Sequence, residues 1–270
     1  MIRLAACDLD GTIVDASGNC DPSVARTVKR LRENGIRFAI CTGRPVGSIM
    51  HLLKHWRLDG ITDYIIGTGG GEVYDCASGK TEKFFTLEPE VILEIIDLYE
   101  PLGLIPTWYR GKDLFVQKKT ADTERVGRRV YVDVYEADVR SLIAQPEIKE
   151  MFVLDPALME KTEAFYRNHQ DSRYVGFKTA FDLFEFNHPS LSKHVGLKAV
   201  GEMMNITPDE MIAFGDTTND LEMLKYVKYG ICMANGTVDA KAAAFDVAGS
   251  VGEQGFAEYC SRHLKTNIFE

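Results

Sequence analysis

The first third of the chain alternates short apolar runs with amphipathic stretches. The apolar runs have the length of buried strands, whereas the stretches between them show the helical spacing of apolar positions. Strands that are apolar throughout and alternate with helices predict a parallel sheet covered on both faces. The expected strands are Ile2–Cys7, Ile36–Cys41 and Tyr64–Gly67, and the expected helices are Pro22–Asn34 and Pro45–Trp56.

This alternation stops at about Phe84 and returns after Pro189. In between, aromatic-rich strand candidates and two helices predict a separate α+β module, in which residues 120–140 show no clear pattern. We therefore expect an α/β core in two pieces, residues 1–83 and 189–270, with an inserted domain at residues 84–188. The expected helices of the insert are Pro89–Tyr99 and Ala157–Asn168, and its expected strands are Pro106–Tyr109, Leu114–Lys118, Ile148–Leu154, Tyr174–Phe177 and Asp182–Phe186. In the second core piece the expected helices are Lys193–Asn205 and Asp220–Tyr226, and the expected strands are Met211–Phe214 and Tyr229–Met233.

Composition and charge narrow the range of partners. The chain has 270 residues, with 31 Lys and Arg against 40 Asp and Glu, and a net charge of −9. This balance argues against a nucleic acid or an anionic membrane as partner, so an anionic ligand needs a local site. No run of about 18 apolar residues suggests a membrane span, and no secretory signal is visible. The six cysteines contain no C-x-x-C pair, so we expect reduced thiols and a cytoplasmic location.

Unusual polar clusters follow several of the expected strands. Because ligands of an open parallel sheet bind beyond the carboxyl ends of its strands, we expect these clusters to converge on one crevice. Several carboxylates at one edge repel each other unless a hard divalent cation lies among them, and Mg²⁺ fits such oxygen ligands best. The clusters are Asp8-Leu9-Asp10-Gly11-Thr12, Thr42-Gly43-Arg44, Lys193, and Gly215-Asp216-Thr217-Thr218-Asn219-Asp220.

The same residue types suit phosphoryl transfer. A lysine, a threonine and exposed backbone N–H groups beside a metal ion form a receptor for a phosphoryl group. If Asp8 attacks phosphorus, it becomes an aspartyl phosphate. Asp10, two residues further on, can then protonate the leaving oxygen and activate water.

These four motifs, in this order, resemble the haloacid dehalogenase-like superfamily, specifically its Cof-like phosphatases. The resemblance covers nearly the whole chain and implies a Rossmann-like core in two pieces, with a mobile α/β cap inserted after the third core strand. It implies Asp8 as nucleophile, Asp10 as acid/base, and Thr42 and Lys193 as ligands of the phosphoryl group. It also implies that Mg²⁺ binds the Asp8 carboxylate, the Asp10 backbone carbonyl and Asp216. The other candidates are Leu9, Gly43, Arg44 and Asn219 for substrate or phosphate binding, and Asp220 in support.

Some positions depart from the usual pattern of that family. His194 stands where a glycine usually follows the lysine, Gly69-Gly70-Gly71 replaces an Asn-Gly pair, and Ala234-Asn235-Gly236 replaces Gly-Asn-Ala. These departures concern substrate handling more than chemistry. The role of Arg44 is open at this stage, since it could contact phosphate or tie a helix N-terminus to a nearby carboxylate.

The aromatic and basic residues of the insert could have either functional or structural roles. Its aromatic residues could stack on a ring-bearing substrate, but a small α+β module needs most of them for its own core. The basic residues could steer anions or form a solvated face, and the second is the commoner case. The aromatic residues are Trp108, Tyr109, Phe115, Phe177 and Phe181, and the basic ones are Lys118, Lys119, Arg125, Arg128 and Arg129.

The expected function is a Mg²⁺-dependent phosphatase of small phosphate monoesters, such as sugar phosphates, nucleotides or cofactor phosphates. One alternative is a phosphosugar mutase resembling the phosphomannomutases, which would return the phosphoryl group to a sugar. Another is a phosphometabolite-binding protein without catalysis, but such a protein needs no nucleophile like Asp8 beside an acid/base like Asp10. The expected partner is a small phosphorylated metabolite, and no residue pattern indicates an oligomeric state.

Overall fold

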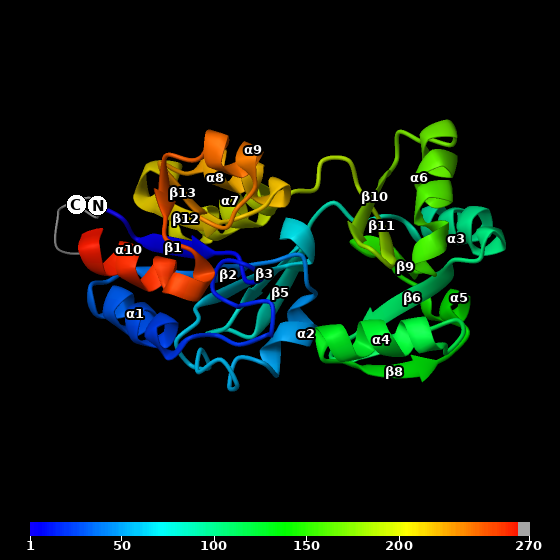
Figure 1. Ribbon diagram of the computed structural model, residues 1–270, viewed down its shortest axis with the longest axis horizontal. Coiled ribbons are helices and arrows are strands. Elements are labelled where there is room, and N and C mark those ends of the chain that lie inside the picture. Colours follow the sequence, from blue (N-terminus) through cyan, green and yellow to red (C-terminus); the bar gives the residue numbers. More distant parts are fainter. Residues whose placement is uncertain (264–270) are drawn as a thin grey trace. The chain divides into compact units, whose positions relative to one another are not determined.

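The chain divides into two units in the computed structural model, which describes residues 1–263 (Figure 1). The first unit comprises Met1–Val46, Met50–Glu82 and the chain from Ser192 onward, and the second comprises Lys83–Leu191 with Gly47–Ile49. The domain boundaries predicted after residues 83 and 188 lie next to these limits, and the assignment of folding domains stays a prediction. Residues 264–270, at the end of the predicted second core piece, lie outside the described residues.

A mostly parallel sheet forms the centre of the first unit. Its strands lie in the order β14-β13-β12-β1-β2-β3-β4-β5, and the six from β14 to β3 are parallel. This arrangement confirms the predicted α/β class. The strands are β1 Leu4–Cys7, β2 Arg37–Cys41, β3 Tyr64–Gly67, β4 Glu72–Asp75, β5 Lys80–Lys83, β12 Met211–Gly215, β13 Tyr229–Met233 and β14 Asp246–Ala248.

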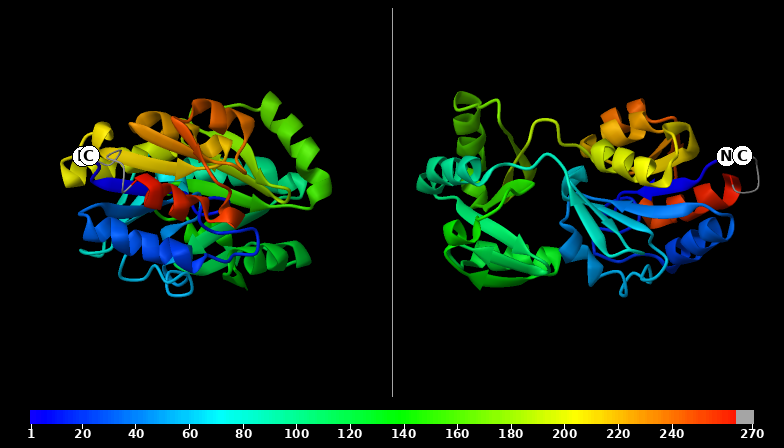
Figure 2. Two further views of the ribbon diagram at one scale, coloured as in Figure 1. Left: turned by 60° about the vertical axis from the view of Figure 1, so that its left-hand side comes forward. Right: turned by 180° about the vertical axis from the view of Figure 1, so that it is seen from behind.

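Helices cover both faces of this sheet. Figures 1 and 2 show α1 and α10 on one face and α7, α8 and α9 on the other. Strands β1 and β12 are buried along their whole length, and β2 is buried after its exposed first residue, Arg37. This burial explains their apolar sequences. The helices are α1 Pro22–Glu33, α7 Lys193–Met204, α8 Leu221–Tyr226, α9 Val238–Ala243 and α10 Gly255–His263.

The structure corrects one predicted helix and adds a hairpin. The helix expected at Pro45–Trp56 is only the short α2, Val46–Met50, and turns follow it. Trp56 is 2% exposed, and its indole N–H donates to the Gly18 carbonyl at 3.0 Å. The apolar residues in this segment have helical spacing, but turns bury them instead of a helix. Strands β4 and β5 were not predicted, because β4 is only partly buried and β5 is a wholly exposed, polar strand.

The second unit is an α+β module with its own sheet. Among the residues described, its strands lie in the order β10-β11-β9-β6-β7-β8, and all neighbours are antiparallel except β7 and β8. Its helices are α3 Pro89–Tyr99, α4 Ala121–Val130, α5 Val139–Leu142 and α6 Met159–Asn168, and its strands are β6 Ile105–Arg110, β7 Asp113–Val116, β8 Asp133–Glu136, β9 Lys149–Val153, β10 Val175–Ala180 and β11 Leu183–Asn187.

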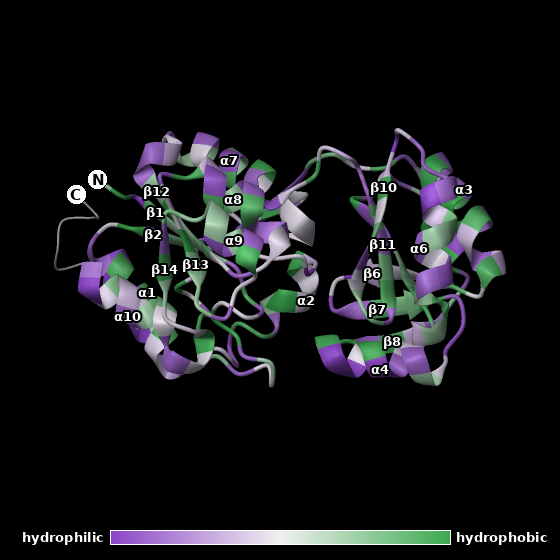
Figure 3. Ribbon diagram, turned by 45° about the horizontal axis from the view of Figure 1, so that its top comes forward, coloured by the Kyte–Doolittle hydropathy of each residue, from purple (hydrophilic) through white to green (hydrophobic). Residues whose placement is uncertain are grey.

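Apolar clusters pack on both faces of the second sheet. On β9, Phe152 joins the cluster that includes residues of α3, α5 and α6, whereas Met151 and Val153 join a cluster with Val126 of α4. This alternation follows from the two-residue period of a strand. Figure 3 shows hydrophobic and hydrophilic residues alternating along the covering helices. No helix within residues 1–263 is both long and apolar enough to cross a bilayer.

The unassigned segment at residues 120–140 contains α4 and β8. Thr120 caps α4 through a capping box with Thr123, and Tyr131 ends the helix in a left-handed conformation. Local capping therefore determines both ends of the helix.

Two of the basic residues of α4 have a structural partner. Arg125 Nε and Arg129 Nη2 donate to the fully buried carboxylate of Asp182 at 3.0 and 2.7 Å, and both guanidinium groups lie over the Phe181 ring. Their positive charge is therefore matched by a buried carboxylate within the second unit.

Replacing Asp182 with asparagine should destabilise the second unit by about 2 kcal/mol. The substitution leaves two arginines without their carboxylate, and the cost stays below that of a fully buried pair because both arginines are about one-third exposed. Hydrogen exchange of the β9 and β11 amides measures the loss. Asp122→Asn is the matched control, since Asp122 also accepts from Arg125 but is partly exposed. Equal protection in both variants would contradict the structural role of Asp182.

Candidate active site

Three polar clusters meet because their strands are neighbours. Strand β1 lies between β2 and β12, with Cys7 opposite Ile40 on one side and Phe214 on the other. Asp8 follows β1 directly, and its backbone N–H donates to the Phe214 carbonyl at 2.9 Å. Asp216 follows β12 in the same way, so the carboxyl ends of neighbouring strands bring the two carboxylates together.

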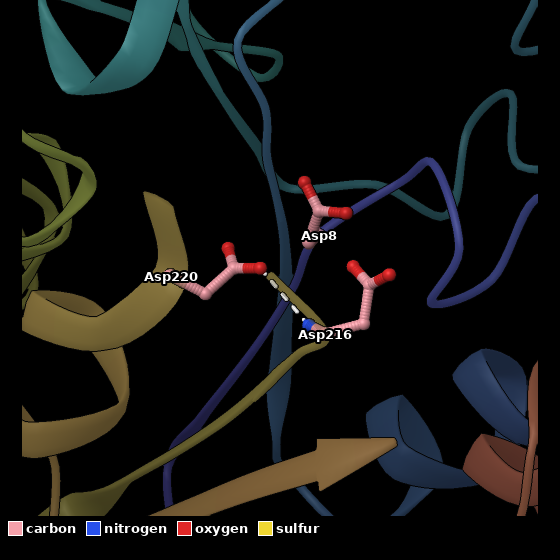
Figure 4. A group of neighbouring side chains, drawn as sticks. All are labelled: Asp8, Asp216 and Asp220. Carbon is pink, nitrogen blue, oxygen red and sulfur yellow. Dashed lines mark hydrogen bonds between the residues drawn. The ribbon is translucent and has the colours of Figure 1, made fainter. Parts of the chain in front are cut away.

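The carboxylates of Asp8, Asp216 and Asp220 form a buried cluster. Each offers an oxygen, and these oxygens lie within 4.8 Å of one another. The three residues are 6%, 7% and 0% exposed. Figure 4 shows the side chains gathered beyond the strand ends, with Asp220 turned toward the backbone of Asp216.

Lys193 supplies the cation of this cluster. It is the first residue of α7, is 2% exposed, and its ammonium group lies 2.6 Å from an oxygen of Asp8 and 2.6 Å from one of Asp220. A longer contact of 3.4 Å reaches Asn219 Oδ1. A lysine held in this way provides a fixed positive charge at the nucleophile candidate.

Burial dominates the electrostatics of the cluster. Desolvation raises the pKa of Asp8 to about 8, against the opposing effect of Lys193. Desolvation, followed by the charge of Asp220, raises the pKa of Asp216 to about 6. Burial alone would lower the pKa of Lys193, but Asp8 and Asp220 outweigh it and raise that pKa well above its usual range. Lys193 therefore stays charged, whereas burial opposes ionisation of Asp8 and Asp216.

The donor set fits a hard divalent cation. Three carboxylates face one ammonium group, so the fully ionised cluster has two negative charges in excess. Both oxygens of Asp220 already have partners, namely Lys193 on one and the amides of Asp216 and Thr217 on the other. Asp8 and Asp216 are therefore the side chains with oxygen available for a metal ion, and Asp220 orients the loop.

The backbone around Gly11 is held against Asp216. Gly11 has φ +90°, and a Cβ there would lie 2.3 Å from Asp216 Oδ2, so only glycine allows this approach. Thr12 Oγ1 donates to Asp216 Oδ1 at 3.4 Å. Asn235 Nδ2 donates to the Gly11 carbonyl at 2.8 Å, and its Oδ1 accepts from the Val251 amide at 2.9 Å. The sequence identified Asn235 only as part of a departure from the family pattern, because its partners are distant in the chain.

Asp10 and Arg44 form a pair at the edge of the cluster. Arg44 donates to both carboxylate oxygens of Asp10, through Nε at 2.9 Å and Nη2 at 2.6 Å. Of the two roles left open for Arg44, the structure contains the contact with a carboxylate. Thr42 is 1% exposed and its Oγ1 accepts the Arg44 amide at 3.2 Å.

The remaining candidates occupy different environments. The Leu9 side chain is fully buried, so only its backbone could meet a substrate, and its carbonyl accepts the amides of Thr12, Ile13 and Val14. Gly43 is exposed in the loop after β2. Asn219 is exposed, and its Oδ1 also accepts from Thr217 Oγ1 at 2.8 Å.

The departures near Lys193 have structural explanations. A Cβ on Gly70 would lie 2.1 Å from the Ser192 carbonyl, so glycine lets this loop contact the start of α7. His194 points elsewhere: its Nδ1 pairs with Ser192 Oγ and its ring lies 5.9 Å from that of Tyr226. Both residues help to fix the beginning of the helix that carries Lys193.

Comparison with known proteins finds relatives that match nearly the whole chain. The haloacid dehalogenase-like hydrolase family matches residues 5–259. The HMP-PP phosphatase of Cronobacter sakazakii is 26% identical over 98% of this chain and 96% of its own. The 5-amino-6-(5-phospho-D-ribitylamino)uracil phosphatase YitU of Bacillus subtilis is 23% identical over 97% of each chain. A haloacid dehalogenase-like hydrolase from Bacteroides thetaiotaomicron has the same fold, with a TM-score of 0.89 and 24% identity over 97% of this chain and 100% of its own. The chain therefore belongs to the haloacid dehalogenase-like hydrolases.

Proposed function

We propose that this hydrolase is a Mg²⁺-dependent phosphatase of small phosphate monoesters. The observation that carries the proposal is the buried Asp8 carboxylate, which lies 2.6 Å from the Lys193 ammonium group and beside Asp216. A carboxylate fixed against a cation can attack phosphorus while the same cation balances the charge of the phosphoryl group. The two phosphatase relatives support the same activity.

Two proton transfers by Asp10 would complete the reaction. In the first step an Asp8 oxygen bonds to phosphorus as the ester bond breaks, and the Asp10 proton passes to the leaving oxygen. In the second step a water oxygen bonds to phosphorus, a water proton passes to Asp10, and the Asp8 carboxylate leaves. Thr42, Lys193 and Asn219, with the amides of Leu9 and Gly43, would hold the phosphoryl oxygens.

Mg²⁺ fits the excess negative charge of the cluster. The Asp8 carboxylate, the Asp10 backbone carbonyl and Asp216 would hold it, with Asp220 in support. When bound, the cation would offset the charge of the phosphoryl group and of the carboxylates around it.

Mg²⁺ should raise the melting temperature more at about pH 8 than at about pH 5. The pKa of Asp216 rises from 3.8 to about 6 on folding. Its contribution to the stability of the metal-free chain is thus complete below 3.8 and is lost as the pH rises through 6. Folding also raises the pKa of Asp8, the other carboxylate proposed to hold the cation, to about 8. Since the cation must displace both protons, its affinity should fall about tenfold per pH unit below about 8, and more steeply below about 6.

Thermal unfolding with Mg²⁺ and with EDTA, at both pH values, measures this difference. Asp59→Asn is a control, since Asp59 is exposed in a turn outside the cluster. A Mg²⁺ effect that is equal at both pH values would contradict metal binding by the carboxylates of Asp8 and Asp216.

Hydrolysis of a panel of phosphorylated metabolites tests the proposed activity. The panel contains sugar phosphates, nucleotides, flavin mononucleotide and pyridoxal phosphate, each with Mg²⁺ and with excess EDTA. We expect release of inorganic phosphate from at least one class with Mg²⁺ only. Isomerised sugar phosphate without release of inorganic phosphate would identify a mutase, and full activity in EDTA would contradict the metal requirement.

We also propose a cytoplasmic location. All six cysteines are free thiols, and four of them are buried. Burial raises the pKa of Cys20 to about 12 and of Cys76 to about 11, so the two less buried thiols also remain protonated. Thiols in this state suit a reducing compartment.

A further inference from the structure

The guanidinium group of Arg44 makes a two-point contact with the carboxylate of Asp10. Two different nitrogens of one guanidinium group each donate to a different oxygen of one carboxylate, at 2.9 and 2.6 Å. Such a two-point contact fixes both the position and the plane of the carboxylate. The Asp10 side chain is 50% exposed, and without this contact it could rotate in solvent.

The backbone of Arg44 is itself firmly held. Its amide donates to Thr42 Oγ1 at 3.2 Å, and its carbonyl accepts the Thr68 amide at 2.8 Å. The Arg44 side chain is only 17% exposed. Its third nitrogen, Nη1, is enclosed by protein and has no hydrogen-bond partner within residues 1–263. The guanidinium group therefore starts from a fixed point and has little freedom to move toward a ligand.

The charge distribution also separates Arg44 from the nucleophile. The ammonium group of Lys193 balances Asp8 and Asp220, whereas Arg44 balances Asp10. Each candidate for a chemical role thus has its own cation, and the one beside Asp8 is lysine.

We propose that Arg44 is a positioning residue, which acts on the reaction by holding the Asp10 carboxylate and not by binding the phosphoryl group. The inference rests on the proposed phosphatase function. A general acid must lie within hydrogen-bond reach of the leaving oxygen, so a freely rotating Asp10 would protonate it less often. Arg44 would therefore matter most for esters whose leaving group needs a proton.

Esters with different leaving groups distinguish positioning from phosphate binding. The test compares p-nitrophenyl phosphate, whose phenolate leaves without a proton, with the best alkyl phosphate of the metabolite panel. For Arg44→Ala we expect kcat/KM to fall at least about tenfold on the alkyl ester and less than about threefold on the aryl ester. Arg44→Lys should behave like Arg44→Ala, because lysine keeps the charge but cannot make the two-point contact.

A double variant tests whether Arg44 acts through Asp10. In an Asp10→Asn background, Arg44→Ala should cause no further loss on the alkyl ester, since the group that it holds is already absent. Arg26→Ala, on the exposed side of α1, is the control for losing an arginine. Melting temperatures of all variants report folding, and competitive inhibition by inorganic phosphate reports phosphate binding.

The outcomes separate this inference from the proposed function. Unchanged inhibition by inorganic phosphate together with the selective loss on the alkyl ester supports the inference. Equal losses on both esters, weaker inhibition by phosphate, or additive losses in the double variant would overturn it while leaving the phosphatase activity established. A wild-type protein that is inactive on every ester would overturn the proposed function, and the positioning role with it.

Discussion

Replacing Asp8 with asparagine is expected to reduce turnover by at least about 10³-fold while leaving the protein folded. An amide keeps the size of the side chain and one oxygen acceptor, but it is a far weaker nucleophile toward phosphorus. The loss should appear in kcat on every ester, because formation of the aspartyl phosphate precedes all later steps.

The same variant should be as stable as the wild type, or more stable, when no metal is present. Burial raises the pKa of Asp8 to about 8, so the folded chain favours an uncharged group at this position, and an amide is permanently uncharged. Melting temperatures in EDTA at about pH 8 measure this effect.

Asp15→Asn is the matched control for Asp8→Asn. Asp15 lies in the same loop and is only half-buried, and its Oδ1 accepts two backbone amides, which an amide oxygen can also do. It should keep near wild-type turnover. Substantial activity of Asp8→Asn would show that the nucleophile lies elsewhere.

Replacing Lys193 with methionine should impair both catalysis and stability. Methionine keeps the length of the side chain but leaves Asp8 and Asp220 without their cation. We expect turnover to fall by about 10²- to 10³-fold, because a fixed charge at the phosphoryl group is lost. We expect the free energy of unfolding to fall by about 3 to 5 kcal/mol, the usual cost of breaking a buried ion pair.

The loss of stability should grow with pH. Without Lys193, the pKa of Asp8 rises further, since the lysine is the main group that lowers it. A carboxyl group with a raised pKa stabilises the folded chain at low pH, and this contribution is lost as the pH increases. Melting curves in EDTA at about pH 6 and about pH 8 measure the trend.

Lys198→Met is the control on the same helix, because Lys198 is exposed. We expect its melting temperature and turnover to match the wild type. A loss of stability in Lys193→Met that is independent of pH would indicate a packing defect instead of uncompensated carboxylates.

The elements of the fold that are buried could be predicted from their apolar sequences. The buried strands β1, β2 and β12 have continuous apolar sequences, and their order with the helices between them indicates a parallel sheet. The hairpin of β4 and β5 was not predicted, because β5 is wholly exposed and has no apolar run. The length of α2 was overestimated because burial of Trp56 by turns leaves the same spacing as burial by a helix.

The sequence predicted which residues converge at the candidate site, but not the hydrogen bonds between their side chains. Strand ends and motif order brought Asp8, Asp216 and Lys193 into one hypothesis, since neighbouring strands determine where their loops meet. The pairing of Arg44 with Asp10 and the bond from Asn235 to Gly11 depend on side-chain directions between distant loops. A single sequence contains no local signal for such contacts.

The interrupted core also has a consequence for how the protein is made. Lys193 follows Asp8 by 185 residues, and β1 pairs with β12 across a similar interval. As the chain leaves the ribosome, β1 can pair with β2 at once, whereas its other edge must wait for β12. The contiguous segment between them can fold during this delay. We therefore expect the candidate site to form only after β12 has emerged, because nascent chains that end before β12 lack Asp216 and Asp220 of the carboxylate cluster.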